Sequence, residues 1–254
     1  MRITGTIRLA LAGLLLALTG ACAAPGPGAD GINDPFEPTN RKIHAFNRGI
    51  DRALVRPAAQ GYSSLIPDPI EDSIGNFSEN LGRPSLVVNA LLQGDLEGAG
   101  LSTVRFLTNS VLGFGGLFDV ADEFNVPDHD TDFGETLYVW GAGEGVYMEL
   151  PVLGPSTTRD TVGRVVDLFT NPLSYELPEP ERYYGTAASV ASRLSDRGRF
   201  TDTIDSILYE SADSYAQSRL IYLQNRRFEL GADTAGSSLD PYADPYEDPY
   251  AILD

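Results

Sequence analysis

The only cysteine of this 254-residue chain, Cys22, is placed where its thiol could be acylated. Arg2 and Arg8 give a basic start, residues 9–18 form a short apolar run, and small residues occupy positions 19–21. This order is typical of a secretory signal peptide, and the apolar run is too short to span a bilayer. We therefore predict a signal peptide over residues 1–22 that ends at a lipid-modified Cys22.

The residues around Cys22 refine this prediction. Thr19 stands where the usual lipidation motif has Leu, so the motif is imperfect, and the alternative is an ordinary cleaved signal peptide that happens to contain a cysteine. Ala23 follows the cysteine instead of the Asp that retains some lipoproteins in the inner membrane, which favours the outer membrane. A lipid-modified cysteine carries more than one acyl chain, which is sufficient for stable anchoring.

A second group with possible chemistry is the acidic run at 128–132, where Asp128, His129, Asp130 and Asp132 are potential metal ligands. Hard cations bind carboxylate oxygens, but the run lacks the Gly and the terminal Glu of an EF-hand loop. It also has no accompanying pair of His or Cys residues that would indicate zinc. We interpret it as a solvated loop and expect neither a metal nor a cofactor.

A third possibility is a serine hydrolase acting on lipids. A serine nucleophile needs an adjacent base, and the chain has no Gly-x-Ser-x-Gly motif. Ser156 comes nearest to one, and the two histidines, His44 and His129, are not placed by any recognisable pattern. A lipid hydrolase therefore remains only a less favoured alternative.

The charge of the chain limits its partners. It has 18 basic and 36 acidic residues, a net charge of −18, and loss of Arg2 and Arg8 with the signal peptide makes this about −20. Nucleic acid is excluded as a partner because no basic stripe could displace phosphate counterions. Attachment to a membrane must come from burial of apolar surface and from the acyl anchor.

The elements that would position these groups are mainly helical. Residues 23–32 are rich in Gly and Pro and are expected to form a flexible tether before a single folded domain at 33–230. Ile43, Phe46, Ile50 and Leu54 have helical spacing, with a helix expected from Asn40. Further helices are expected at 70–81, at 84–112 in two apolar halves split at 93–95, at 162–169, and at 184–230 with a join at 198–202.

The remaining segments are not regular helices. Residues 125–136 are expected to form a polar loop, and 136–151, too rich in Gly for a helix, an extended loop or one short hairpin. The tail at 231–254 repeats Asp-Pro-Tyr, is acidic, and is expected to be disordered. The fold class is therefore mainly α, with a short extended or hairpin segment and a disordered C-terminal tail.

The block that opens the folded domain is unusual in composition. It contains Asn33, Asp34, Pro35, Phe36, Glu37, Asn40 and Arg41, followed by Phe46 and Asn47. By local physics alone this is a helix entry ordered by proline, capped by Thr39 or Asn40 and given negative charge at its start. That interpretation would require no function.

The same block resembles the start of the MlaA (VacJ) family of outer-membrane lipoproteins, and the resemblance extends over about residues 33–230. It continues in Asn76-Phe77, Asn80-Leu81, Leu92-Gln93-Gly94, 113–121, Trp140-Gly141, Gly154-Pro155, Arg159-Asp160 and Asn171-Pro172. The resemblance implies a single ring-shaped helical domain lying in the inner leaflet of the outer membrane. It also implies a central amphipathic channel that removes mislocalised phospholipids from the outer leaflet and passes them to a periplasmic carrier protein.

The resemblance further implies a porin trimer as partner and no covalent catalysis. The opening block would be the structural signature of the ring, and Gly113, Phe114, Gly115, Gly116, Leu117 and Phe118 a candidate flexible or pore-adjacent segment. Helices at 84–112 that are apolar on more than one side suit immersion in lipid. The other alternative is a structural lipoprotein that binds a porin without transporting lipid.

Overall fold

The structure is a computed structural model that describes residues 32–231, while the predicted anchor at Cys22, the rest of the tether and the Asp-Pro-Tyr tail lie outside the described residues. The elements follow in the order α2 (Glu37–Ile50), η2 (Asp51–Val55), α3 (Arg56–Leu65), α4 (Asp68–Gln93), α5 (Leu96–Val111), α6 (Val120–Glu123), α7 (Phe133–Val139), β1 (Tyr147–Leu150), β2 (Gly154–Thr157), α8 (Thr158–Thr170), α9 (Leu173–Glu176), η3 (Glu181–Tyr183), α10 (Tyr184–Arg199), α11 (Thr201–Asp205), η4 (Ser206–Glu210) and α12 (Ser214–Glu229). The fold is mainly α, as predicted.

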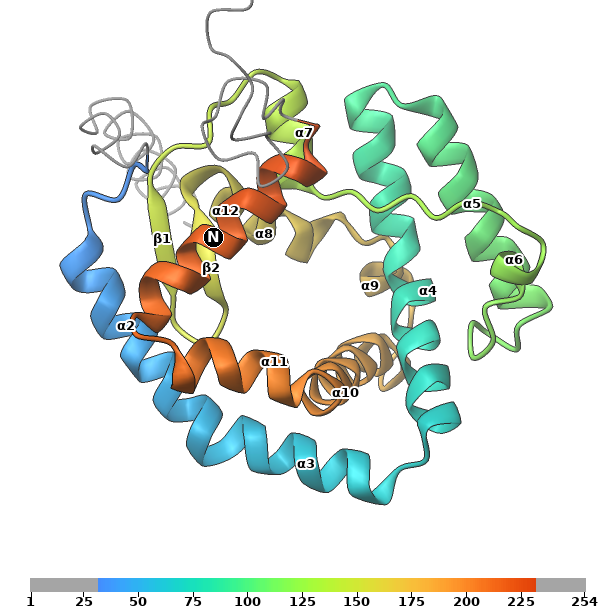
Figure 1. Ribbon diagram of the computed structural model, residues 1–254. Helices are drawn as coiled ribbons and strands as arrows, with labels where there is room; N and C mark the ends of the chain where they lie inside the picture. The colour runs from blue at the N-terminus through green and yellow to red at the C-terminus, as the bar shows by residue number, and fades with distance from the viewer. Residues whose placement is uncertain (1–31, 232–254) are drawn as a thin grey trace, which may run out of the picture.

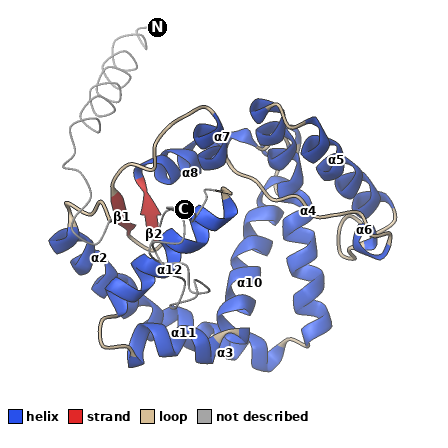
Figure 2. Cartoon of the chain, turned by 45° about the horizontal axis from the view of Figure 1, so that its top comes forward, coloured by secondary structure: helices blue, strands red, loops and turns tan. Residues whose placement is uncertain are grey.

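The helices are arranged as a ring (Figure 1). Helices α2 and α3 form one side, α4 stands opposite, and α7, α8 and the hairpin of β1 and β2 complete the circle. Helices α10 and α11 run along the inner side of α3, and α10 packs against both α3 and α4. Helix α12 crosses the hairpin toward α7. Helix α5 packs on α4 outside the ring, and α6 packs on α5. Figure 2, turned by 45°, shows the same closed arrangement.

The first helix is longer than the sequence predicts. It begins at Glu37, with Pro38 in its first turn, and continues through the π-helical turn η2 into α3. The predicted capping by Thr39 or Asn40 is wrong, because Phe36 occupies the N-cap position without a side-chain cap and the helix starts before Asn40. The Asn40 amide is instead used for contacts with β1, described below.

Helix α4 also differs from expectation. Separate helices were predicted at 70–81 and from Pro84, but α4 runs unbroken from Asp68 to Gln93 with Pro84 inside it. Proline in a helix interior removes one backbone hydrogen bond, a cost that tertiary packing can outweigh. Packing against α5, α7, α8 and α10 holds α4 together. It ends, as predicted, at Gly94, whose φ of 79° suits a residue without Cβ.

The segment after α6 was only partly predicted. Helix α7 (Phe133–Val139) lies where a polar loop and a non-helical stretch were expected, with Asp132 capping it through the Glu135 amide at 2.7 Å. The short hairpin is present, with β1 and β2 antiparallel and Tyr147 opposite Thr157. Its turn contains Val152 at a φ of 68°, a strained position for a β-branched residue. The predicted join near 198–202 is confirmed between α10 and α11, but the second of the two predicted helices is interrupted again at 211–213, between η4 and α12.

Burial in this domain is inverted relative to an ordinary globular protein. The buried side chains include Arg83, Arg105, Arg159, Arg197 and Arg219, whereas the buried apolar cluster is small, made of Tyr147, Tyr215 and Leu223. Large apolar side chains lie outside instead: Phe46, Leu54, Leu65, Leu96, Leu107, Val111, Phe114 and Phe228 are all more than half exposed. Exposure of so many large apolar side chains is typical of a protein that meets lipid or another protein.

The first helix illustrates the inversion. In its apolar stripe, Phe46 and Leu54 are exposed and Ile43 and Ile50 are only half-buried, so the stripe does not form a core face. Its inward face carries Asn40, His44 and Asn47, spaced as helical neighbours. Within residues 32–231, no helix is both long and apolar enough to cross a membrane.

Candidate functional site

The opening block forms a ladder of side chains that holds the hairpin against α2. The Asn40 amide donates to the Tyr147 carbonyl at 3.2 Å and its Oδ1 accepts from the Glu149 amide at 3.1 Å. Two helical turns on, Asn47 donates to the Leu150 carbonyl at 2.9 Å and accepts from the Val152 amide at 2.7 Å. These amides take the place of a third strand on the free edge of β1, so the block positions the hairpin inside the ring.

The acidic members of the same block connect the start of the domain to α12, which helps to close the ring. Asp34 accepts hydrogen bonds from Asn40 at 2.8 Å, from Arg219 at 2.7 Å and from the Tyr215 hydroxyl. Burial, together with the hydrogen bond to Asp34, raises the pKa of Tyr215. Glu37 binds Arg41 at 2.7 Å.

On the surface of the domain, Arg41 adds a further contact between α2 and the segment before α12. Its guanidinium binds Asp213 through two hydrogen bonds of 3.0 and 2.9 Å. That contact lowers the pKa of Asp213 to about 2. Asn33 binds the hairpin through its carbonyl, which accepts from Tyr147 at 2.8 Å. Pro35 and Phe36 are exposed and make the entry turn of α2.

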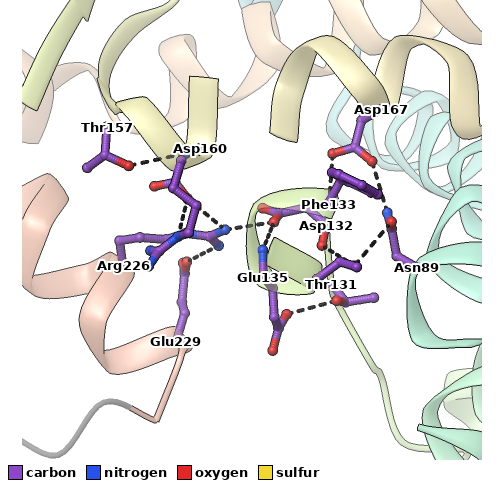
Figure 3. Close-up of polar contacts among 12 residues, drawn as sticks. Asn89, Thr131, Asp132, Phe133, Glu135, Thr157, Asp160, Asp167, Arg226 and Glu229 are labelled. Atoms are coloured by element: carbon purple, nitrogen blue, oxygen red, sulfur yellow. Dashed lines mark hydrogen bonds and ion pairs between the residues drawn. The ribbon is translucent and has the colours of Figure 1, made fainter. Parts of the chain in front are cut away.

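A second polar network joins α4, α7, α8 and α12 on the opposite side of the hairpin (Figure 3). Asp160 accepts from Arg226 at 3.3 Å, and Arg226 also binds Asp132 at 2.7 Å. Burial opposes ionisation of Asp160, but the hydrogen bond from Tyr222 and the charges of Arg226 and Arg159 outweigh it and hold the pKa of Asp160 below its usual value.

The same network reaches α4 through Asp167. This carboxylate accepts from Asn89 at 2.9 Å and from the Phe133 amide at 3.0 Å, so one side chain of α8 ties α4 to the start of α7. Glu135, on α7, binds Thr131 at 2.8 Å, and burial raises the pKa of Glu135. The ring is thus closed by buried polar contacts and not by an apolar core.

The residues of the acidic run are drawn apart by these contacts. Asp128 binds Arg83 at 2.8 Å, His129 lies 3.2 Å from Asp95, and Asp132 caps α7. Across the described residues, no group of three or more His, Cys, Asp or Glu side chains could hold a metal ion.

The candidate nucleophile and its bases are not brought together either. Ser156 is fully buried and its hydroxyl contacts Thr157 and Thr161, away from both histidines. His44 instead lies between two residues that sequence reasoning missed. Its Nε2 is 3.0 Å from Ser214 Oγ and its Nδ1 is 3.2 Å from Glu149 Oε1. The three residues come from segments far apart in the chain, and no local sequence motif predicts that they meet.

Ser214, His44 and Glu149 are connected as the members of a catalytic triad are, but the groups around them differ from those of an active site. The Ser214 hydroxyl also accepts from Arg48 at 3.3 Å, and Glu149 also binds the Tyr147 hydroxyl at 2.6 Å. At the start of α12, the Ala216 amide is occupied by Asp213 at 3.1 Å. Oxyanion stabilisation requires free donors aimed at the reacting carbonyl. The trio serves to satisfy both ring nitrogens of a buried histidine.

Two cavities open among the elements that face the middle of the ring in Figure 1. The larger, of about 490 Å³, is lined by α4, α8, α9, η3 and α10. The smaller, of about 280 Å³, lies between α2, the hairpin, η4 and α12. Leu153, in the hairpin turn next to the strained Val152, lines both cavities. The ladder from α2 therefore fixes the hairpin whose turn contributes to the walls of both cavities.

The larger cavity is amphipathic. Leu81, Leu153, Leu168, Leu173 and Leu177 give it apolar walls, while Arg193, Glu181, Ser189 and Asn171 give it polar ones. A cavity of this size, with mostly apolar walls and a few polar groups, is suited to an amphipathic small molecule.

The glycine-rich segment at 113–118 lies in the turn after α5, outside the ring in Figure 1, and lines neither cavity. Its glycines allow close packing: a Cβ on Gly113 would lie 2.2 Å from the Phe118 carbonyl oxygen, and one on Gly116 would lie 2.5 Å from Asn80 Cβ. Gly115 accepts from Asn80 at 3.3 Å. Phe114 and Phe118 are exposed and contact each other edge to face. The segment is a tight, hydrogen-bonded turn that presents aromatic rings outward.

Comparison with known proteins agrees with this arrangement. A model of the family described as MlaA lipoprotein matches residues 32–229. The intermembrane phospholipid transport system lipoprotein MlaA of Escherichia coli (strain K12) is 34% identical over 226 residues, covering 87% of this chain and 88% of that protein. The protein of the same name from Haemophilus influenzae is 32% identical over 205 residues, covering 78% and 79%.

A solved structure is also similar. It comes from work on the structural basis for maintenance of bacterial outer membrane lipid asymmetry, is 30% identical in sequence, and superposes with a TM-score of 0.64 over 78% of this chain and 98% of that one. The family model spans nearly the whole described domain, and the similar proteins match along most of their own length. The chain therefore belongs to the MlaA lipoprotein family.

Proposed function

We propose that this protein is an outer-membrane lipoprotein that removes mislocalised phospholipids from the outer leaflet and passes them to a periplasmic carrier, so maintaining lipid asymmetry. The names of its relatives place them in an intermembrane phospholipid transport system. No bond is made or broken in such a task. The protein has only to offer a path on which the charged head group avoids the hydrocarbon.

The observation that carries the proposal is the inverted burial of the ring. Large apolar side chains such as Leu65, Leu107 and Val111 lie outside, and paired arginines and carboxylates lie inside. In water this distribution would be costly, whereas in lipid it exposes apolar groups to acyl chains and keeps polar groups together. We propose that the ring lies in the inner leaflet, anchored in addition by Cys22, with its interior cavities as the path.

Two macromolecular partners complete the proposal. A porin trimer would hold the ring against the outer membrane, and a soluble periplasmic carrier would receive the lipid. The exposed aromatic turn with Phe114 and Phe118 is available for lipid or protein contact. Affinity purification of the full-length protein after chemical crosslinking tests the porin contact, and loss of the crosslink on Phe114→Ser would place it at this turn.

The test of the transport function is genetic. Deleting the gene should raise the phospholipid content of the outer leaflet, measured by labelling amine head groups at the cell surface. The wild-type protein should restore the low level, and Cys22→Ala should restore it poorly because the protein is not delivered to the outer membrane. Unchanged outer-leaflet phospholipid in the deletion strain would refute transport. A porin-binding lipoprotein without transport activity would give this same unchanged level.

One observation favours a second candidate, a lipid hydrolase: the contacts of His44 with Ser214 and Glu149. A hydrolase would release free fatty acid or lysophospholipid from vesicles and would lose this activity in Ser214→Ala. We expect no release from either protein, because Arg48 and Tyr147 occupy the groups that catalysis would need. Release that depends on Ser214 would replace the transport proposal.

A further inference from the structure

Ten arginines of the described domain pair with carboxylates within 4.0 Å. The paired ones are Arg41, Arg56, Arg83, Arg105, Arg159, Arg197, Arg199, Arg219, Arg226 and Arg227. Of the other arginines whose side chains are described, Arg48 donates to Ser214, Arg164 donates to the Pro155 carbonyl and Arg52 lies over the Tyr209 ring. Arg193 differs, since within the described domain its guanidinium has no carboxylate within 4.0 Å, no hydrogen bond and no aromatic ring beneath it. It lines the larger interior cavity. Its side chain is exposed, so its guanidinium is accessible to an anionic group that enters this cavity.

A carboxylate with the complementary property lines the same cavity. Glu181, in η3, has a buried Oε2 atom without a hydrogen-bond partner. An unsatisfied buried carboxylate oxygen costs free energy that a bound cation or hydrogen-bond donor would recover. The other acid of this cavity, Asp167, is already engaged by Asn89 and by the Phe133 amide. The cavity therefore offers one unpaired positive group and one unsatisfied negative group.

The two groups are placed along one helix. Glu181 lies just before α10, and Arg193 lies on the face of α10 that lines the cavity together with Thr186 and Ser189. Nine residues of helix from Tyr184 to Arg193 give about 14 Å of rise. Helical side chains generally lean toward the N-terminus, a tendency that favours an Arg193 guanidinium on the Glu181 side of its own Cα. The separation excludes a direct ion pair and leaves room between them for a group that carries both charges.

We infer that this cavity binds the head group of a zwitterionic phospholipid, with the phosphodiester at Arg193 and a primary ammonium at Glu181. The planar guanidinium suits a phosphate because it can donate two parallel hydrogen bonds. Leu153, Leu168 and Leu177 supply apolar wall for the glycerol and the first acyl carbons. A head group with net negative charge would gain from Arg193 but be repelled by Glu181. This inference rests on the proposed function and names the lipid class that the same path prefers.

Binding is tested with the full-length lipidated protein in detergent, incubated with vesicles that contain equal amounts of phosphatidylethanolamine and phosphatidylglycerol. Lipid retained after purification is quantified by mass spectrometry. The wild type should retain an excess of phosphatidylethanolamine. Glu181→Gln should lower the ratio of the two lipids about fivefold, and Arg193→Gln should lower retention of both about tenfold.

Matched controls come from the same chain. Asp196→Asn removes an exposed acid of α10 outside the cavity lining, and Lys42→Gln removes an exposed base of α2. Both should retain lipid as the wild type does. Arg193→Lys keeps the charge and should recover part of the retention, which separates loss of binding from loss of folding. Glycerophosphoethanolamine should compete for the site and inorganic phosphate should compete only weakly.

Two outcomes overturn the inference. One is a lipid ratio that Glu181→Gln leaves unchanged, and the other is equal competition by inorganic phosphate, which would mean a plain anion site. Outer-leaflet phospholipid in cells is measured in parallel. If the wild type lowers the outer-leaflet phospholipid but Glu181→Gln leaves the lipid ratio unchanged, only the head-group inference fails. If the wild type does not lower the outer-leaflet phospholipid, the transport function fails as well.

Discussion

Replacing Asn40 by Ala tests whether the amide ladder holds the hairpin in the ring. Asn40 is 4% exposed and makes three hydrogen bonds, to the Asp34 carboxylate and to the backbone of Tyr147 and Glu149. A hydrogen bond to a charged group contributes about 2 kcal/mol and each neutral one about 1 kcal/mol, so the loss is about 4 kcal/mol in the free energy of unfolding.

The assay is thermal unfolding in detergent followed by circular dichroism. For a domain of this size each kcal/mol shifts the midpoint by about 3 °C, so Asn40→Ala should lower Tm by about 12 °C. The control is Asn225→Ala, which removes an exposed amide that binds only Glu229 on the surface of α12 and should change Tm by about 1 °C.

Hydrogen exchange gives a second readout within the same molecule. The Glu149 amide should exchange faster in Asn40→Ala because its acceptor is gone. The Val152 amide, held by Asn47, should keep most of its protection. A Tm within about 2 °C of the wild type, with unchanged exchange at Glu149, would refute the role of the ladder.

Two further predictions concern the turn after α5 and the stability of the domain at acidic pH. Gly113→Ala should lower stability by about 3 kcal/mol because the new methyl would meet the Phe118 carbonyl at 2.2 Å, whereas Gly49→Ala, with open space around it, should raise Tm slightly. The Arg41 hydrogen bonds lower the pKa of Asp213 to about 2, from 3.8, so its contribution is present above about pH 4 and is lost as the pH falls toward about 2. Asp213→Asn should therefore lose less stability than the wild type over this range, measured by urea unfolding at each pH.

Much of the secondary structure could be predicted from local signals. Gly94 ends α4 as expected, and α8 ends at Thr170, one residue beyond the predicted 169, because turn residues and helical periodicity act locally. Pro84 misled the prediction, since the penalty of an interior proline is outweighed by packing of α4 on its neighbours. Helix α7 was missed because its stability comes from the Asp132 cap and from contacts with α8.

The sequence alone does not show which face of each helix is buried and which is exposed. The stripe that contains Phe46 and Leu54 would mark a core face in a water-soluble protein, yet both side chains are exposed. The ring itself was expected only from the family resemblance. Its closure depends on pairs such as Asp34 with Arg219, 185 residues apart, which no local pattern can pair.

For the same reason, some residues of the candidate site were predicted from the sequence and others were not. Asn40 and Asn47 were singled out by resemblance, and the structure gives them a physical role as the ladder on β1. Arg193 and Glu181 were missed, because an arginine on a helix face has no distinguishing local signal. Within the described domain, Arg193 is set apart by having neither a carboxylate partner nor a side-chain hydrogen bond nor a ring contact, and only the structure shows this.

The central claim, that phospholipid passes through the ring, is tested most directly by filling the larger cavity. Ser189 lines it from α10, whereas Ala187 is exposed on the same helix outside the lining. Ser189→Trp should fold, reach the outer membrane, and leave outer-leaflet phospholipid as high as in the deletion strain, while Ala187→Trp should restore the wild-type level. Full restoration by a folded, correctly located Ser189→Trp protein would contradict the account.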